Sequence, residues 1–210
     1  VLMLFRMGDF YEIFGEDGPR TARRLQICDD DFTCDVPRAV SVLDSIGRTS
    51  LKLSAFQASV RDFLLREGSG HAMNESLLDA IRPALFQDAG RFAELASGPA
   101  SGRVPPSTGV FVHLGVEAFN DADLRRLGKG YHARDACELT DQLDRRGIVH
   151  DAYLILSGPG TRLQDLAETF LVIQRLKLEH PHTFYVRIPV VPFVVPIFPP
   201  ASYALWLTRI

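Results

Sequence analysis

The sequence is poor in cysteine, because only Cys28, Cys34 and Cys137 occur among its 210 residues. An odd number of cysteines this small argues against a disulfide framework and favours a reducing compartment. We therefore expect a cytoplasmic protein. An excess of charge of one sign is also lacking, since 23 lysines and arginines face 26 aspartates and glutamates. The formal net charge of -3 therefore gives no electrostatic reason to expect a nucleic-acid partner.

Long uninterrupted apolar runs are missing as well. The opening VLMLF is too short for the hydrophobic region of a signal peptide, and acidic residues follow soon after it. The apolar segment 189–207 contains several prolines, which disfavour a membrane-spanning helix. We therefore expect no membrane partner, and a chain of this length suits one domain with a substantial core.

Several short catalytic motifs are absent. The sequence contains no GxxxxGKS or GxxxxGKT phosphate loop, no GxGxxG, no GxSxG and no HExxH. The six histidines are scattered, and the pair His180 and His182 has no cysteine nearby, so we interpret it as a surface loop and predict no metal site. No catalytic residue can be named from these patterns.

What is present is an alternation of apolar segments with amphipathic ones. Strands are predicted near 25–28, 51–56, 110–116, 151–156 and 183–190, with helices between them. This alternation predicts an α/β fold with a parallel sheet. Two architectures are open: a partial TIM-like barrel, and a doubly wound sheet, which requires a reversal of strand order.

A Pro/Gly/Ser-rich loop at 97–109 is the best candidate for an internal hinge.

Capping residues mark the starts of the predicted helices. The predicted helices start at Asp35, at Asn74, at Asn120 or Asp121, and at a capping box of Thr161 with Gln164; Gly47 and Gly147 end two of them, and Pro83 disturbs a third.

Polar residues follow the predicted strands: Asp29 and Asp30 the first, Gln57 the second, Glu117 the third. In parallel βα architectures ligands bind at the carboxyl ends of the strands. These side chains could form a shared rim that binds an ammonium group or ribose hydroxyls. Alternatively, the acidic residues do no more than cap helices.

The N-terminal segment 1–24 is predicted as an amphipathic helix, because Phe5, Phe10, Ile13 and Phe14 occur at roughly helical spacing. Within it, FRMGDFYE resembles the opening of the DNA mismatch-repair protein MutS, over residues 4–18. That resemblance implies that Phe10 wedges beside a mismatched base and that Glu12 hydrogen-bonds to it. Mismatched DNA is the partner expected under this alternative alone.

A second resemblance covers about residues 19–195. LGVEAF, LRRLGKGY, RRGI and AYLILSGPGT, in this order and spacing, resemble the radical S-adenosylmethionine (radical SAM) core, especially its cobalamin-associated and elongator-protein-like branches. The resemblance favours the partial barrel, truncated at the N-terminus. It also favours a division into a segment 1–24, a barrel 25–195 and a proline-rich tail 196–210.

This resemblance implies site residues for S-adenosylmethionine. Asp29 and Asp30 would contact the methionine moiety, Glu117 would lie near the ribose, and Leu154 and Ile155 would line the adenine end. Gln57 follows the second strand on the same rim. The family's serine after Glu117 is replaced by Ala118, which weakens that contact, and the glutamate after its glycine turn is replaced by Arg162 or lost.

The family's defining CxxxCxxC is missing, and the three cysteines present do not have its spacing. Three correctly placed thiolates are required to bind the 4Fe-4S cluster of this family. We therefore expect a fragment or degenerate form of a radical SAM enzyme that binds S-adenosylmethionine without cleaving it. Cobalamin is expected only of a longer protein, and a non-catalytic chimeric fragment is the remaining alternative. The small-molecule or macromolecular substrate is not predicted.

Overall fold

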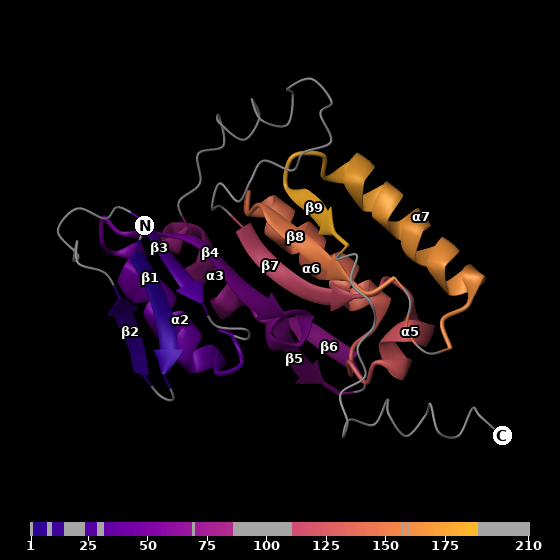
Figure 1. The fold of residues 1–210 in the computed structure, drawn as a ribbon, viewed down its shortest axis with the longest axis horizontal. Helices are drawn as coiled ribbons and strands as arrows, with labels where there is room; N and C mark the ends of the chain where they lie inside the picture. Colours follow the sequence, from indigo (N-terminus) through magenta and orange to yellow (C-terminus); the bar gives the residue numbers. More distant parts are fainter. Residues whose placement is uncertain are drawn as a thin grey trace.

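A computed structural model describes residues 2–7, 10–14, 24–28, 32–68, 70–85, 111–156, 158 and 160–188. Its main element is a seven-stranded sheet with the order β2-β1-β3-β4-β7-β8-β9 (Figure 1). Every neighbouring pair is parallel except β1 with β2. The strands are β1 Leu2–Met7, β2 Phe10–Phe14, β3 Arg24–Cys28, β4 Lys52–Ser59, β7 Phe111–Glu117, β8 His150–Leu154 and β9 Phe184–Arg187.

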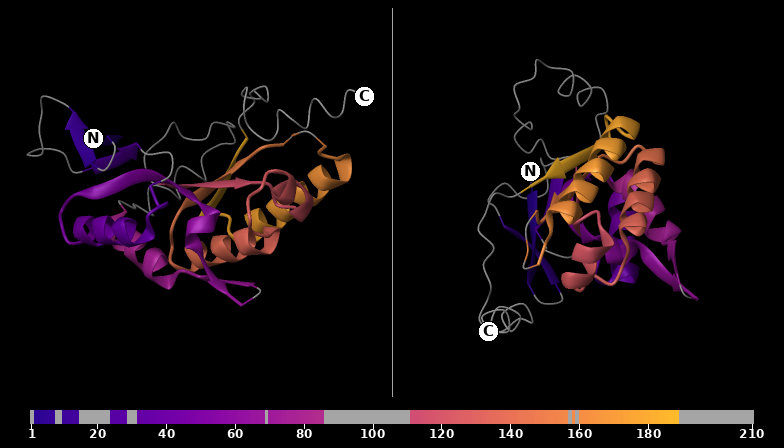
Figure 2. Two further views of the ribbon diagram at one scale, coloured as in Figure 1. Left: turned by 90° about the horizontal axis from the view of Figure 1, so that it is seen from below. Right: turned by 90° about the vertical axis from the view of Figure 1, so that its right-hand side faces the viewer.

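Helices connect successive parallel strands and lie together on one side of the sheet, as both views of Figure 2 show. These helices are α2 Val36–Gly47, α3 Glu75–Ala84, α5 Asp121–Arg126, α6 Ala133–Arg145 and α7 Leu163–Glu179. A short 3-10 helix, Val60–Phe63, and a separate hairpin of β5 Leu64–Glu67 with β6 Gly70–Met73 come between β4 and α3.

The strand order from β3 to β9 follows the chain without a reversal. A doubly wound sheet needs such a reversal, whereas a partial barrel does not. The prediction of an α/β fold with a partial (βα) barrel is therefore confirmed. All five predicted strands are present, although β9 is described only from Phe184 to Arg187 and the segment 189–207 lies outside the described residues.

Alternation along β7 explains how the sheet packs. Val112, Leu114 and Val116 are buried in the core, whereas His113 and Glu117 occupy the alternate positions and are partly exposed. Since successive side chains of a strand point to opposite faces, one face of β7 packs on the helices and the other is available to a ligand. The core between sheet and helices also contains Leu43, Leu78, Ile81, Leu139, Leu143 and Phe184.

The prediction of an N-terminal helix is wrong. Leu2–Met7 and Phe10–Phe14 are instead the strands β1 and β2, which pair antiparallel with each other, and β1 also pairs in parallel with β3. Phe5, Phe10, Ile13 and Phe14 are compatible with helical spacing, but β-branched and aromatic residues also favour strands, and the free edge of β3 provides a template for pairing. The proposed boundaries at 24 and 195 stay predictions.

Two helix predictions also need correction. The helix expected from Asn120 to Gly147 is two helices, α5 and α6, separated where Gly128 and Gly130 adopt positive φ angles of 67° and 72°. The N-cap of α7 is Arg162, one residue later than the predicted cap at Thr161, and its backbone N–H donates to the Asp165 carboxylate at 3.0 Å. By contrast, Asp35 and Asn74 cap α2 and α3 as predicted, and Pro83 lies in the last turn of α3.

The hinge candidate 97–109 lies outside the described residues.

Candidate functional site

A cleft of about 430 Å³ lies at the carboxyl ends of β4, β7 and β8. Strand ends and the loops after them supply its lining: Gln57, Ala58, Ser59, His113, Gly115, Glu117, Lys129, Tyr153, Leu154 and Ile155. A complete βα barrel fills its interior with branched apolar side chains. Here the cleft instead presents an imidazole, a carboxylate and a phenol from the strands and the ammonium group of Lys129 from the loop after α5, beside the apolar Leu154 and Ile155.

Four of the residues predicted from the sequence line this one cleft: Gln57, Glu117, Leu154 and Ile155. Asp29 and Asp30 lie outside the described residues. Phe10 and Glu12 belong to β2, the strand at the opposite edge of the sheet from β9, where Glu12 is in register with Phe5 of β1.

Glu117 has an unusual backbone conformation at the end of β7. Its φ angle is 67°, the one positive value among described residues other than glycine, and the Ala118 N–H donates to the Val116 carbonyl oxygen at 2.8 Å. A three-residue turn of this kind is strained and is rare outside sites where the surrounding structure enforces it. The Ile155 N–H donates to the Glu117 carbonyl at 2.8 Å and fixes the turn against the end of β8.

Lys129 pairs with this strained residue. Its ammonium nitrogen lies 2.9 Å from the Glu117 Oε1, and both side chains are partly exposed to the cleft. Two backbone hydrogen bonds at the C-terminus of α5 fix the position of Lys129. The Lys129 N–H donates to the Leu124 carbonyl oxygen, and the Gly128 N–H donates to the Arg125 carbonyl oxygen. This pair of bonds is the Schellman arrangement, which requires the positive φ of Gly128.

Tyr131 fixes the other side of this turn. Its hydroxyl donates to the Val116 carbonyl oxygen at 2.8 Å, and burial raises the pKa of the phenol, so it remains a neutral donor. Lys129 and Tyr131 were not predicted as site residues. The letters GKGY carried a usable signal, because glycines on both sides of a lysine indicate a tight loop after the helix.

A second polar group lies on the same face, further from the strand ends. The His113 Nδ1 is 2.7 Å from the Asp151 Oδ1, and the Arg187 Nε is 2.5 Å from the Asp151 Oδ2. The Arg187 guanidinium also donates to the Tyr153 hydroxyl at 3.2 Å. Asp151 is buried, and a buried carboxylate is costly unless it is paired. The Arg187 guanidinium beside it provides that pairing. His113, Asp151 and Arg187 were not predicted as site residues, although His113 is four residues before Glu117 in β7 and therefore lies on the same face.

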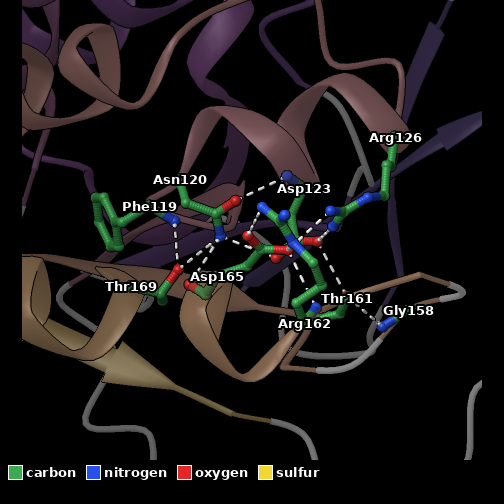
Figure 3. A network of polar contacts seen from close by, with 9 residues as sticks. All are labelled: Phe119, Asn120, Asp123, Arg126, Gly158, Thr161, Arg162, Asp165 and Thr169. Carbon is green, nitrogen blue, oxygen red and sulfur yellow. Dashed lines mark hydrogen bonds and ion pairs between the residues drawn. The ribbon is translucent and has the colours of Figure 1, made fainter. Parts of the chain in front are cut away.

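A buried polar network holds the loop after β8 against α5 (Figure 3). Asp165 accepts from the Arg162 guanidinium at 2.8 Å and from that of Arg126 at 2.7 Å, and these bonds hold the pKa of its carboxyl far below the usual value. Arg126 also pairs with Asp123, which accepts from the Thr161 hydroxyl at 3.0 Å. The loop that contributes Ile155 to the cleft is thereby tied to the helix that positions Lys129.

Asn120 extends the same network into the helix layer. Its side-chain oxygen accepts the Asp123 N–H at 2.8 Å, as an N-cap of α5 should, and its amide nitrogen donates to the Asp165 carbonyl and to the Thr169 hydroxyl of α7. Figure 3 shows these side chains converging from α5 and α7. The prediction of a cap at Asn120 was right. Its contacts with α7 could not be predicted, because they join residues 45 or more positions apart.

The described structure defines a class of fold: a parallel βα half-barrel with a polar cleft at the carboxyl ends of its strands. Solved structures with a similar fold include two cobalamin-dependent radical SAM enzymes. TsrM from Kitasatospora setae, a radical S-adenosylmethionine methyltransferase with cobalamin and a 4Fe-4S cluster bound, is 14% identical with a TM-score of 0.53, over 79% of this chain and 26% of that one. OxsB with aqua-cobalamin and S-adenosylmethionine bound is 13% identical with a TM-score of 0.58. That match covers 90% of this chain and 28% of OxsB.

At this identity the likeness establishes a shared fold, and the chain spans about a quarter of the length of either enzyme. A family model, MutS domain I, matches residues 1–37. None of the curated proteins matches the chain. In the part of the chain that the structure describes, no helix is both long and apolar enough to cross a membrane.

Proposed function

We propose that the cleft at the ends of β4, β7 and β8 binds S-adenosylmethionine. The observation that supports this most is the convergence of Gln57, Glu117, Leu154 and Ile155 on one cleft, since these are residues that the radical SAM resemblance implies for S-adenosylmethionine or that follow a predicted strand on the same rim. The shared fold of OxsB, whose structure contains S-adenosylmethionine, adds to it.

The chemistry of the ligand suits these groups. The Glu117 carboxylate is an acceptor for ribose hydroxyls, and Leu154 and Ile155 offer apolar contact to an adenine ring. Lys129 is a donor within reach of the same ligand, and its ion pair with Glu117 holds the carboxylate at the cleft in the free protein. A ligand that replaces this pair must compensate both charges, which the zwitterionic methionine moiety and the ribose can do.

We also propose that this chain does not hold a 4Fe-4S cluster, because its cysteines lack the CxxxCxxC spacing. Among the cysteines whose side chains are described, Cys34 is exposed before α2 and Cys137 lies within α6, on the helix side of the sheet. Neither lines the cleft. The place beside β3 is taken by β1, whose sequence LMLFRM contains no cysteine. We therefore propose binding of S-adenosylmethionine without reductive cleavage, and we assign no contact to cobalamin.

Binding is tested by isothermal titration calorimetry with S-adenosylmethionine, on the wild-type chain and on Glu117→Gln. The variant keeps the shape of the side chain but removes its charge, so affinity should fall about 10- to 100-fold, as for loss of a hydrogen bond to a charged group. Glu67→Gln, in the exposed strand β5, is the matched control and should bind like the wild type. Absence of binding to the wild type, or equal affinity in Glu117→Gln, overturns the proposal.

The absence of cleavage is tested separately. After anaerobic reconstitution with iron and sulfide, the chain should show no stable cluster absorption, and dithionite should release no 5′-deoxyadenosine from S-adenosylmethionine. Formation of that product would contradict our assignment of the cysteines and leave the binding proposal intact.

A second candidate function rests on the MutS domain I match at residues 1–37. Under it, Phe10 wedges beside a mispaired base and Glu12 bonds to it. The test is a mobility-shift titration of heteroduplex against homoduplex DNA, with Phe10→Ala as control. Equal binding to both duplexes excludes this function. If the chain binds neither S-adenosylmethionine nor mismatched DNA, the remaining interpretation is a non-catalytic chimeric fragment.

A further inference from the structure

A cluster of titratable side chains lies away from the cleft, where the C-terminal turns of α6 and α7 meet. We call Asp141, Asp144, Glu179 and His180 the α6–α7 cluster. Asp141 and Asp144 belong to α6, Glu179 is the last residue of α7, and His180 follows it. Figure 1 shows α6 and α7 running alongside β8 and β9.

His180 is the centre of this cluster and only 11% of its side chain is exposed. Its Nε2 lies 2.7 Å from the Asp141 Oδ1. Its Nδ1 lies 3.1 Å from the Asp144 Oδ2 without the geometry of a hydrogen bond, and it is a buried nitrogen that has no hydrogen-bond partner among the described residues. Both ring nitrogens therefore face carboxylates, and one of them is poorly satisfied.

The ligand atoms available here are close enough to share one ion. One atom each from Asp141, Glu179 and His180 all lie within 4.8 Å of one another. The charges are unbalanced, since three carboxylates surround one imidazole, and the Arg175 Nε lies 3.9 Å from the Glu179 carboxylate. A cation bound between Asp141, Glu179 and the Nε2 of His180 would offset this excess of negative charge.

We propose that the α6–α7 cluster binds a divalent transition-metal ion of the zinc class. His180, Asp141 and Glu179 are the three protein ligands, and water takes the fourth position. Asp144, whose Oδ2 lies 3.1 Å from the Nδ1 of His180, would accept a hydrogen bond from that nitrogen after a small rotation and orient the imidazole, as a carboxylate behind a metal-bound histidine does. Thr183 in turn donates to Asp144 and holds that carboxylate in place.

The donor set decides the class of metal. An imidazole with two carboxylates suits zinc, whereas magnesium and calcium prefer oxygen ligands alone. Tetrahedral bonds of about 2.1 Å place two ligand atoms roughly 3.4 Å apart. The separation of 2.7 Å between His180 and Asp141 therefore needs to open by less than 1 Å, which a rotation of the aspartate side chain supplies.

The position of the cluster suggests what the ion does. It lies at the ends of helices that lead back into strands, which is the face of a βα fold that contributes stability rather than catalysis. An ion there would join α6 to the α7–β9 connection. This inference does not depend on the binding of S-adenosylmethionine in the cleft.

The experiment is equilibrium dialysis of the full chain against zinc chloride, with metal measured by inductively coupled plasma mass spectrometry. We expect one zinc ion per wild-type chain and at least a tenfold loss of affinity in Asp141→Asn and in His180→Gln. Glu138→Gln, an exposed carboxylate on the same helix, is the matched control and should bind like the wild type. Zinc at about a hundredfold excess over its dissociation constant should also raise the melting temperature of the wild type by about 5–10 °C.

Asp141→Asn keeps the size of the side chain, so it separates loss of the metal from loss of the fold. Its circular dichroism in the absence of zinc should match the wild type. Weak or absent binding by the wild type overturns the proposal. Equal affinity in Asp141→Asn overturns it as well, because the zinc would then be held by other histidines or cysteines of the chain.

Discussion

At the scale of single residues, His150 is the most completely buried titratable group of the described structure, with no exposed surface. Its Nδ1–H donates to the Ile148 carbonyl oxygen at 3.0 Å, and its Nε2 has no partner among the described residues. The ring packs against Phe184 in the core between β8 and β9. Burial lowers the pKa of the imidazole to about 4, because a charged ring would lose its hydration there.

This shift predicts a loss of stability in mild acid. The unfolded chain binds a proton at His150 below about pH 6.5 and the folded chain only below about pH 4, so the stability is present above pH 6.5 and is lost as the pH falls toward 4. Between pH 7 and pH 5 the contribution is about 2 kcal/mol. Urea unfolding at the two pH values measures it.

The change that tests this is His150→Leu, which should remove that part of the pH dependence. His182→Gln replaces an exposed histidine and should keep the dependence of the wild type. An unaltered pH dependence in His150→Leu would show that the buried imidazole is not responsible.

At the scale of elements, the break between α5 and α6 positions the cleft. The positive φ of Gly128 closes the C-terminus of α5 and places Lys129 beside Glu117. Gly158 provides a comparison in the loop after β8, since its φ is not positive and an added Cβ would meet only the Thr161 hydroxyl at 3.8 Å.

We expect Gly128→Ala to lower the free energy of unfolding by about 1 kcal/mol, because an L-residue in the left-handed region costs roughly that much. Gly158→Ala should change it by less than about 0.5 kcal/mol. Chemical denaturation measures both. A larger cost at Gly158 than at Gly128 would contradict the backbone assignment of the two loops.

At the scale of the whole molecule, the MutS-like segment and the radical SAM-like segment are joined in one sheet. Four residues of β1 pair with β3: Leu2, Met3, Leu4 and Phe5 are in register with Leu25, Gln26, Ile27 and Cys28. The N-terminal hairpin therefore covers an edge of the parallel sheet that would otherwise be free to pair with another chain.

Deletion of residues 1–14 should then destabilise the rest of the chain, by about 2–4 kcal/mol from the lost backbone bonds. Denaturation measures the stability, and size-exclusion chromatography should show association through the uncovered β3. In the full chain, hydrogen exchange at the amides of β3 should be slow. A truncated chain as stable as the whole would show instead that segment 1–24 is an independent unit.

Much of the fold was predictable because it rests on local patterns. The five parallel strands and the caps at Asp35, Asn74 and Asn120 follow from apolar runs and from short polar side chains at helix starts. The hairpin at residues 2–14 was not predictable, since its apolar spacing also suits a helix and only pairing with β3 selects the strand.

The candidate site divides in the same way. By itself the sequence determined the five parallel strands, and it predicted Gln57 and Glu117 as rim residues from their residue type and their position relative to a strand end; both line the cleft. Only the tertiary structure decided that Lys129 pairs with Glu117, that His113 contacts Asp151 and that His180 faces Asp141. Those contacts join elements far apart in the chain, and their geometry is set by how the helices pack on the sheet.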